Sequence, residues 1–524
     1  MRAATTEATA SVAAQGMTRR QTLRALSGLL LVLFVSMVSG TIVSVALPTI
    51  IGSLHGSQSQ YTWVVTALLL TATASTPIWG KLADLFDKKL LVQIAIAVFC
   101  LGSIASGLAQ NVGQLIAART FQGIGVGGLQ ALVQVVIAAM IPPRERGRYN
   151  GYLGGVMAVA TVGGPLLGGL IVDSSWLGWR WCFFFGVPIA VLAAIVLQVT
   201  LRLPPMRRGQ VKIDYLGAIL ITGGVSLLLI WVSFVDDAYA WLSWQTAAMV
   251  GGALVLLAVA LLVEARAPEP VVPLPIVRQR ATALSIIASI AVGMAMFGGG
   301  VFLGQYFQIG RGYSPAEAGM LTTPLMAGVL ISSIIAGRMI SRSGRVKPYI
   351  VAGSFVLVVG FVVLGLIDHA TPLLLVSLGM VLVGVGVGMT MQNLVLVVQN
   401  SVPLRDVGAA SSTIAFFRSL GGTIGISVLG AVLARRVVAR IQHDLAAAGV
   451  PVSASNQASG SLDLASLPDF VQEIVRRAYA DVTGDILLLS AVIAVVGVVA
   501  AALLKPVVLR TTLDLSESRR SMRR

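Results

Sequence analysis

Fourteen long apolar segments constrain the fold of this 524-residue chain more than any other feature. Each can cross a hydrocarbon core of about 30 Å, which takes about 20 residues of helix. Only 11% of the residues are charged, whereas soluble domains carry about 25%. We therefore predict an all-α polytopic membrane protein. The predicted spans are 26–50, 62–81, 90–109, 114–141, 149–172, 181–201, 214–235, 246–264, 282–307, 319–340, 349–367, 373–399, 408–434 and 485–505.

The basic residues are divided unevenly between the two ends of the predicted spans. With the N-terminus inside, 28 of the 37 Lys and Arg residues fall in cytoplasmic tails and loops, and seven fall outside. The remaining two, Arg119 and Arg418, lie within spans. This positive-inside pattern predicts a multi-pass protein of the cell membrane with both termini in the cytoplasm. It accounts for the net charge of +16 without a nucleic-acid partner.

Two similar loop sequences indicate an internal repeat. Gly-Lys-Leu-Ala-Asp follows the second span at 80–84, and Gly-Arg-Met-Ile-Ser follows the tenth at 337–341. Asp84 beside basic residues at helix ends predicts a charge cluster that latches one of two access states. Plain topogenic charge is the alternative, and Ser341 in place of the acid predicts a weaker latch in the second copy. The predicted latch residues are Gly80, Asp84, Lys88, Lys89, Gly337 and Arg345.

The repeat divides the chain into two six-helix bundles and an inserted helix pair, and parallel repeats around a midplane cavity are one transporter architecture. The predicted parts are a disordered cytoplasmic tail at 1–25, a bundle at 26–205, the inserted pair at 206–280, a second bundle at 281–505 and a basic cytoplasmic tail at 506–524. The second bundle includes an outer loop, 435–484. Apolar residues recur at helical spacing from 470 to 479. They predict either a short helix on the outer membrane surface or a solvated helical loop.

Arg119 is the strongest candidate for a functional residue within a span. A charged side chain there costs at least about 2.5–3.5 kcal/mol unless it has a partner or faces a water-filled cavity. Gln122, Gln130 and Gln134 lie on the same segment and indicate a polar face. A purely structural Arg is the alternative. The other candidates for the cavity or for coupling are Ser39, Gln392, Asn393 and Arg418.

A glycine-rich motif in the fifth span predicts a bent and closely packed helix. It comprises Gly164, Pro165, Gly168 and Gly169. Proline lacks a backbone donor, and glycine lets a second helix approach closely. The motif either bears on the direction of transport or forms a structural kink with no bearing on it.

Six motifs in consistent order resemble the major facilitator superfamily, and within it the fourteen-span drug:proton antiporter family of multidrug and antibiotic exporters. They are the loop at 80–89, Arg119–Gly125, Gly164–Gly169, Thr41–Pro48, Gly310–Gly319 and Arg418–Gly425. The resemblance covers roughly residues 25–505. It implies the major facilitator fold and export driven by proton antiport, and the resemblance of the Gly164–Gly169 motif implies export as the direction of transport. Asp87 replaces the Gly of the family's loop pattern, and we expect it to adopt the left-handed turn that Asp tolerates.

One residue departs from the family in a way that bears on coupling. Ser39 stands where these antiporters carry an acid in the first span, and none of the 21 acidic residues lies near the middle of a predicted span. Proton coupling is therefore implied by the resemblance alone. Two arginines without an acid make the interior positive, which favours neutral or anionic lipophilic substrates.

The sequence predicts a secondary active transporter that exports bulky amphipathic compounds, such as antibiotics or toxic metabolites, by alternating access. Its partners are the small-molecule substrate and membrane lipid, and we expect no cofactor or metal and no enzymatic activity. No phosphate-binding loop is visible, and His55, His369 and His443 lack metal-site spacing. An importer or facilitator on the same fold is the alternative, and a polytopic membrane enzyme is the least favoured.

Overall fold

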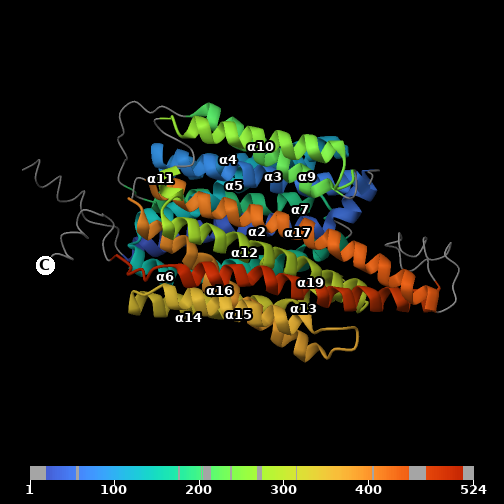
Figure 1. Cartoon of the computed structure of the whole chain (residues 1–524). Helices are drawn as coiled ribbons and strands as arrows, with labels where there is room; N and C mark the ends of the chain where they lie inside the picture. The colour runs from blue at the N-terminus through green and yellow to red at the C-terminus, as the bar shows by residue number, and fades with distance from the viewer. Residues whose placement is uncertain are drawn as a thin grey trace, which may run out of the picture.

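The computed structural model is a bundle of long helices that lie side by side (Figure 1). It describes residues 19–54, 58–174, 177–201, 203, 214–235, 239–267, 274–313, 315–403, 406–447 and 468–510. All fourteen predicted spans fall on helices, so the all-α fold class is confirmed. Twelve helices of the described part are long and apolar enough to cross a membrane. Fourteen crossings remain a prediction, because Leu216–Trp231 is a shorter apolar stretch and the helix at 407–447 is not among the twelve.

The first half of the chain supplies the first six predicted spans. Its helices are α2 (Arg19–Ser53), α3 (Gln58–Leu85), α4 (Lys88–Leu108), α5 (Val112–Met140), α6 (Pro143–Asp173), α7 (Trp181–Phe184) and α8 (Gly186–Thr200). Side-chain caps define two of the boundaries. Asp87 accepts a hydrogen bond from Leu90 N at the start of α4, and Asn111 accepts one from Gln114 N at the start of α5. Such caps satisfy backbone N–H groups that have no partner within the helix.

The second half supplies the inserted pair and the last six predicted spans. The inserted helices are α9 (Tyr215–Phe234) and α10 (Trp244–Glu264), and the short α11 (Leu274–Val277) follows. The remaining helices are α12 (Arg280–Gln305) with its π-helical end η1 (Tyr306–Gly310), α13 (Pro315–Leu321), α14 (Thr323–Ser343), α15 (Lys347–Gly365), α16 (Leu373–Ser401), α17 (Val407–Ala447) and α19 (Asp469–Leu503).

The two halves repeat the same packing pattern. In the first, α3 packs on α5, α2 on α6 and α4 on α5. In the second, the helices at equivalent places pack in the same way, with α14 on α16, α12 on α17 and α15 on α16. The halves meet along two equivalent seams, α3 with α17 and α14 with α6. The repeat inferred from the two loop sequences is therefore present in the packing.

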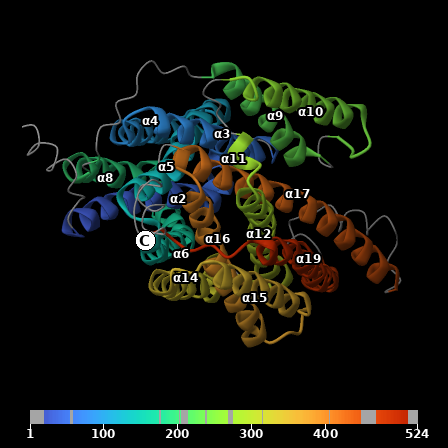
Figure 2. The same ribbon diagram turned by 60° about the vertical axis from the view of Figure 1, so that its left-hand side comes forward.

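The inserted pair lies at one edge of the bundle (Figures 1 and 2). α9 and α10 pack on each other, and α9 also contacts α3 and α17. Val225 and Leu229 of α9 are buried with Phe416 of α17 in a small apolar cluster. The pair therefore covers the α3/α17 seam from outside rather than interrupting either repeat.

The outer loop predicted at 435–484 is largely helical, and the predicted surface helix is wrong. α17 continues to Ala447, and α19 begins at Asp469 and runs without a break to Leu503. Val471 and Val475 of α19 are buried against Val437 and Ile441 of α17. The amphipathic pattern has the correct period, but its apolar face packs on a second helix instead of lipid. Both helices extend past the others at one end (Figure 1), and residues 448–467 lie outside the described part.

The start of the predicted C-terminal tail is also ordered against the bundle. Leu509 and Arg510 are 4% and 7% exposed. Leu509 N donates to Gly344 O at 3.0 Å, and Asn400 Nδ2 donates to Val508 O at 3.2 Å. The tail at 506–524 was predicted from its basic charge alone. Charge does not predict the hydrogen bonds that the backbone of residues 508 and 509 forms with the ends of α14 and α16.

Candidate functional site

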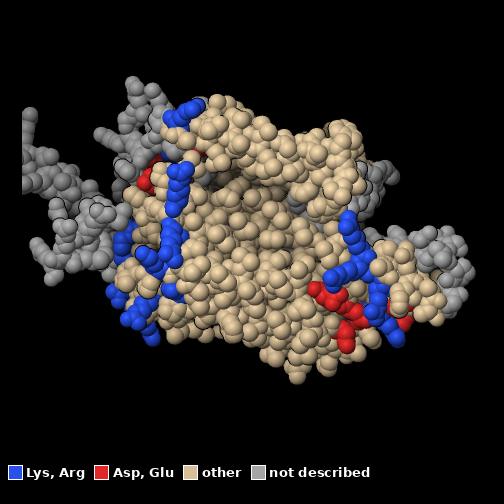
Figure 3. All heavy atoms as spheres, in the orientation of Figure 1, with Lys and Arg blue, Asp and Glu red and all other residues tan. Residues whose placement is uncertain are grey.

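The polar contacts between the two halves gather toward one end of the bundle within the described residues. This end carries Lys88, Arg144, Arg342 and Lys347, and we call it the basic end. Lys and Arg side chains dominate it in Figure 3, whereas both signs of charge gather at the opposite end. The contacts found here hold the two halves together at this end.

Asp84 forms the most direct link between the halves. Its carboxylate accepts hydrogen bonds from Gly408 N and Ala409 N, both at 2.8 Å, in the first turn of α17. Asp84 is 2% exposed. The first turn of a helix has unsatisfied N–H groups and a partial positive charge, so a carboxylate is stabilised there. A side chain of the first half thus caps a helix of the second.

Gly80 makes this approach possible. A Cβ atom at Gly80 would overlap the Ser412 side chain and lie 2.8 Å from Gly408 O. Gly80 is one turn before Asp84 on α3, so both residues face the same turns of α17. The loop motif therefore works through helix approach and helix capping together.

The predicted charge cluster is only partly correct. Lys88 is buried and contributes an electrostatic interaction with Asp84. Lys89 instead donates a hydrogen bond to Gln198 O, in the last turn of α8, at 2.6 Å. Asp87 does not adopt a left-handed turn: its φ is −61°, and it caps α4. The sequence interpretation paired Asp84 with its neighbours in the chain and missed a partner 324 residues away.

The second copy of the loop packs on α6 in the equivalent way but without an acid. A Cβ atom at Gly147 of α6 would lie 2.8 Å from Gly337 O and 3.2 Å from the Ser341 hydroxyl. Arg144 donates to Ser341 O and Arg342 O at 3.4 and 3.3 Å, at the end of α14. Arg345 is exposed and does not join this contact. At this seam the Arg144 side chain donates hydrogen bonds to carbonyl groups at the end of α14. At the first seam the Asp84 carboxylate instead accepts hydrogen bonds from N–H groups of α17.

A buried arginine beside these seams was missed by the sequence interpretation, which treated Arg146 as a topogenic charge. Arg146 is 2% exposed and donates to Gln399 Oε1 of α16 at 3.0 Å. It also donates to Ile141 O at 2.7 Å and Ala138 O at 2.6 Å. Gln399 in turn donates to the Ser411 hydroxyl at 2.9 Å. A glutamine near the end of a span was the available signal for this network.

Arg510 extends the network to the C-terminal segment. Its guanidinium donates to Gln399 O and Val402 O, both at 3.0 Å. Its own carbonyl accepts from Arg144 N at 3.0 Å. The segment is thus bonded to α16 of the second half and to the start of α6 in the first. It acts as a strap across the basic end.

The cavity candidates fall into separate places. Gln134 Nε2 donates to Gln392 Oε1 across the halves at 2.8 Å, and Gln392 Nε2 contacts Met157 Sδ at 3.7 Å. Asn393 donates to Met389 O of its own helix. Gln130 is half-buried. The Gln134–Gln392 pair joins the two halves a few turns from the basic end.

Arg119 belongs to a buried polar cluster inside the first half. Its Nη1 donates to Gln122 Oε1 at 2.9 Å. Gln122 Nε2 donates to the Ser39 and Ser103 hydroxyls at 3.1 and 2.6 Å. Arg119 is 2% exposed and lies 5.8 Å from the centre of the Phe183 ring. Three of the candidates, Ser39, Arg119 and Gln122, lie together in this cluster, whereas Ser103 was missed.

The charge of Arg119 has no acidic partner among the described residues. Its Nε has no hydrogen-bond partner there, and its one polar contact is to a neutral amide. Arg418 is half-buried on α17 and does not reach this cluster. Its Nη1 is likewise without a partner in the described part. Both guanidinium groups therefore remain sources of uncompensated positive charge.

The glycine-rich motif of α6 packs on α2 near this cluster. A Cβ at Gly164 would overlap Thr41, and one at Gly168 would lie 2.8 Å from Ile42 O. Thr41 also donates to Ala160 O at 3.1 Å. A Cβ at Gly169 would meet open space, so this residue does not share the packing role predicted for it.

Comparison with known proteins identifies the class of protein. Residues 29–426 match the model of the Major Facilitator Superfamily. The chain belongs to this superfamily and is a membrane transporter rather than an enzyme.

Two named relatives are similar over most of their length. The multidrug transporter protein MdtP of Bacillus subtilis is 34% identical over 411 residues, which cover 78% of this chain and 75% of MdtP. Efflux pump dotC of Dothistroma septosporum is 30% identical over 501 residues, which cover 94% and 85% of the two chains.

Solved structures share the fold at low sequence identity. The proton:xylose symporter XylE has a TM-score of 0.58 at 14% identity, covering 91% of this chain and 95% of that one. FucP, in its outward conformation, has a TM-score of 0.57 at 13% identity, covering 92% and 99%.

The Asp84 contact generates a first prediction. Asp84→Asn removes the charge and leaves one acceptor oxygen for two N–H groups. Hydrogen bonds to charged groups are worth about 1.5–3 kcal/mol, so we expect roughly a tenfold faster hydrogen–deuterium exchange in peptides covering 406–412. Asp87→Asn is the matched control, because Asp87 caps α4 in the same loop. Equal exchange in both variants would show that Asp84 does not hold the seam.

The strap generates a second prediction. Arg510→Ala removes the guanidinium hydrogen bonds to Gln399 O, Val402 O and the Asn400 side chain, so we expect faster exchange around Gln399 and at the start of α6. Arg24→Ala removes an exposed basic residue from α2 and serves as the control. Unchanged exchange at both places in Arg510→Ala would mean that the segment rests on the bundle without holding it.

Proposed function

We propose that this transporter exports bulky lipophilic or amphipathic compounds by alternating access. The observation that carries the mechanism is the Asp84 cap on α17, because it ties the two halves at one end and must break for that end to open. The similarity to MdtP and dotC, named as a multidrug transporter and an efflux pump, supports the direction and the substrate class. The described contacts correspond to a state shut at the basic end.

The basic end is the cytoplasmic end in this proposal. The excess of Lys and Arg there supports this orientation, since basic loops are retained on the cytoplasmic side. Substrate then enters when the two seams at the basic end part and leaves when they close again. For this end to open, Asp84 must part from α17, and the polar pairs Arg146–Gln399 and Gln134–Gln392 must part at the same time.

Differential stabilisation of two states provides the switch. The carboxylate of Asp84 is shielded and bonded twice in the shut state, and opening exposes both the acid and the α17 terminus to water. The free energy of the contact is therefore part of the balance between access states. Proton antiport is the proposed driving force, supported by the family resemblance.

Transport by the purified chain tests the proposal. We expect inside-out vesicles to accumulate a lipophilic fluorescent compound when their lumen is acidified, and accumulation to collapse when the pH gradient is dissipated. Uptake only in right-side-out vesicles would instead indicate an importer, and transport indifferent to the gradient would indicate a facilitator.

The proposed membrane topology is checked with cysteine variants. A membrane-impermeant thiol reagent should label His443→Cys, but not Arg345→Cys, in intact cells. Both positions are exposed at opposite ends of the bundle, and the native Cys100 and Cys182 are buried. The reverse labelling would invert the proposed topology.

The Arg119 cluster supports a preference for neutral or anionic substrates over cations. Ser39→Asp would place a carboxylate on the Gln122 amide that also contacts Arg119. We expect it to shift a drug-susceptibility panel toward protection from cationic compounds and to make transport more pH-dependent. Ser39→Asn adds similar volume without charge and is the control. Identical profiles for both variants and the native chain would exclude an electrostatic role for this cluster.

A further inference from the structure

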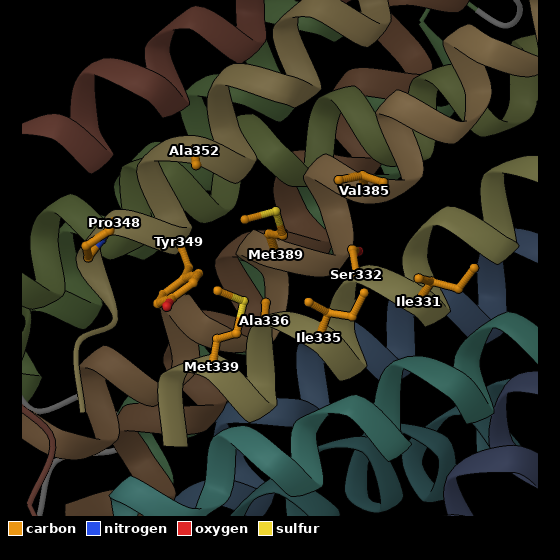
Figure 4. A pocket seen from close by; sticks show the side chains of 10 residues that line it. All are labelled: Ile331, Ser332, Ile335, Ala336, Met339, Pro348, Tyr349, Ala352, Val385 and Met389. Carbon is orange, nitrogen blue, oxygen red and sulfur yellow. The ribbon is translucent and has the colours of Figure 1, made fainter. Parts of the chain in front are cut away.

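A groove opens on the exposed side of the second half, between α14 and α15 (Figure 4). Its volume is about 490 Å³, and α16 forms its floor with Val385 and Met389. Ile335 and Met339 of α14 face Tyr349 and Ala352 of α15 across it. This groove lies outside the seams and clusters described above.

The packing of α16 explains why the groove exists. α16 packs closely on both neighbours: a Cβ at Gly384 would overlap Leu325 O of α14, and one at Gly353 of α15 would lie 2.5 Å from Met389 Cβ. The side chains of Ala336 and Ala352 are too short to fill the space left between α14 and α15. A narrow apolar channel results, open along one side.

The groove runs along α14 toward the basic end. Ile331, Ile335 and Met339 are 56%, 51% and 48% exposed and form one stripe along α14. Arg342 follows Met339 by three residues and continues that stripe, and Lys347 precedes the lining residue Pro348. Apolar surface and basic charge therefore adjoin at the level of a headgroup.

The basic charge at this end of the groove is not neutralised by the described part of the protein. Residues 337–347 contain four basic residues and no acid, whereas the first copy of the loop carries Asp84 and Asp87. Within the described residues, no ion pair reaches Arg338, Arg342 or Lys347. A ligand with a negative headgroup supplies the charge that the second copy lacks.

We propose that this groove binds an anionic phospholipid, with one acyl chain between α14 and α15 and its phosphate at Arg342 and Lys347. Burial of the chain is favoured by the apolar lining, and the headgroup is attracted by basic residues at the membrane surface. The proposal concerns the lipid environment and does not depend on what the protein transports. Its occupant would hold together the ends of α14 and α15, next to the α6 seam.

Native mass spectrometry of the full chain tests the site. The protein is released from micelles containing equal amounts of phosphatidylglycerol and phosphatidylcholine. We expect one phosphatidylglycerol molecule to be retained in preference to phosphatidylcholine. The double variant Arg342→Gln/Lys347→Gln should weaken that retention by about fivefold for each charge removed. Arg20→Gln/Arg24→Gln removes two charges from α2 and should retain the lipid as the native chain does.

A second pair of variants separates the groove from simple surface charge. Ala352→Trp fills the groove and leaves Arg342 and Lys347 unchanged, so it should also abolish the preference. Val362→Trp places the same side chain at a partly exposed position of α15 outside the groove lining. Equal retention of the two lipids by the native chain, or unchanged retention in Ala352→Trp, would overturn the proposal. Displacement of the lipid by a transported compound would reassign the groove to substrate.

Discussion

A carboxylate on a helix terminus joins the two halves of this transporter. Asp84 accepts two N–H groups of α17, and Gly80 brings the helices close enough for it to do so. The contact combines charge, hydrogen bonds and the helix dipole in a place shielded from water, where each is stronger than at a surface. The strap at Arg510, the Arg146–Gln399 pair and the Gln134–Gln392 pair all require the same approach of the halves. Their geometry therefore depends on this seam.

The fold was predictable because its determinants are local, and the partners within the site were not. Hydropathy locates each span without reference to the rest of the chain, and two loop sequences reveal the repeat. The sequence predicted a role for Asp84 and paired it with its neighbours Lys88 and Lys89. It did not predict the hydrogen bond between Asp84 and the backbone of α17. The prediction of a surface helix at 470–479 was wrong for the same reason, because the partner of that helix is distant in the sequence. An amphipathic period indicates that one face will be covered, but α17 rather than lipid covers it here.

The Arg119 cluster shows an intermediate case. Arg119 and Gln122 were predicted to share a polar face and Ser39 was a separate candidate, and Gln122 connects the other two residues. The polar face predicted for this helix lies in the interior of the first half, since Arg119 and Gln122 are almost fully buried. The Arg119 guanidinium has a hydrogen bond only to a neutral amide, so its positive electrostatic potential is largely uncompensated. Because neighbouring hydroxyl groups cannot cancel a unit charge, a negative or carbonyl-rich group approaching this region gains more than a cation does.

The two seams share a backbone pattern but differ in charge. At α3/α17 the acid is part of the protein, so the shut state is stabilised by a contact that the chain contains in full. At α14/α6, Ser341 replaces the acid and Arg144 binds carbonyl groups, and Arg338, Arg342 and Arg345 of the second loop are exposed. Opening the first seam exposes a carboxylate, whereas opening the second breaks the hydrogen bonds of Arg144 to backbone carbonyl groups. The two seams therefore differ in whether a buried acid must be uncovered when the halves part.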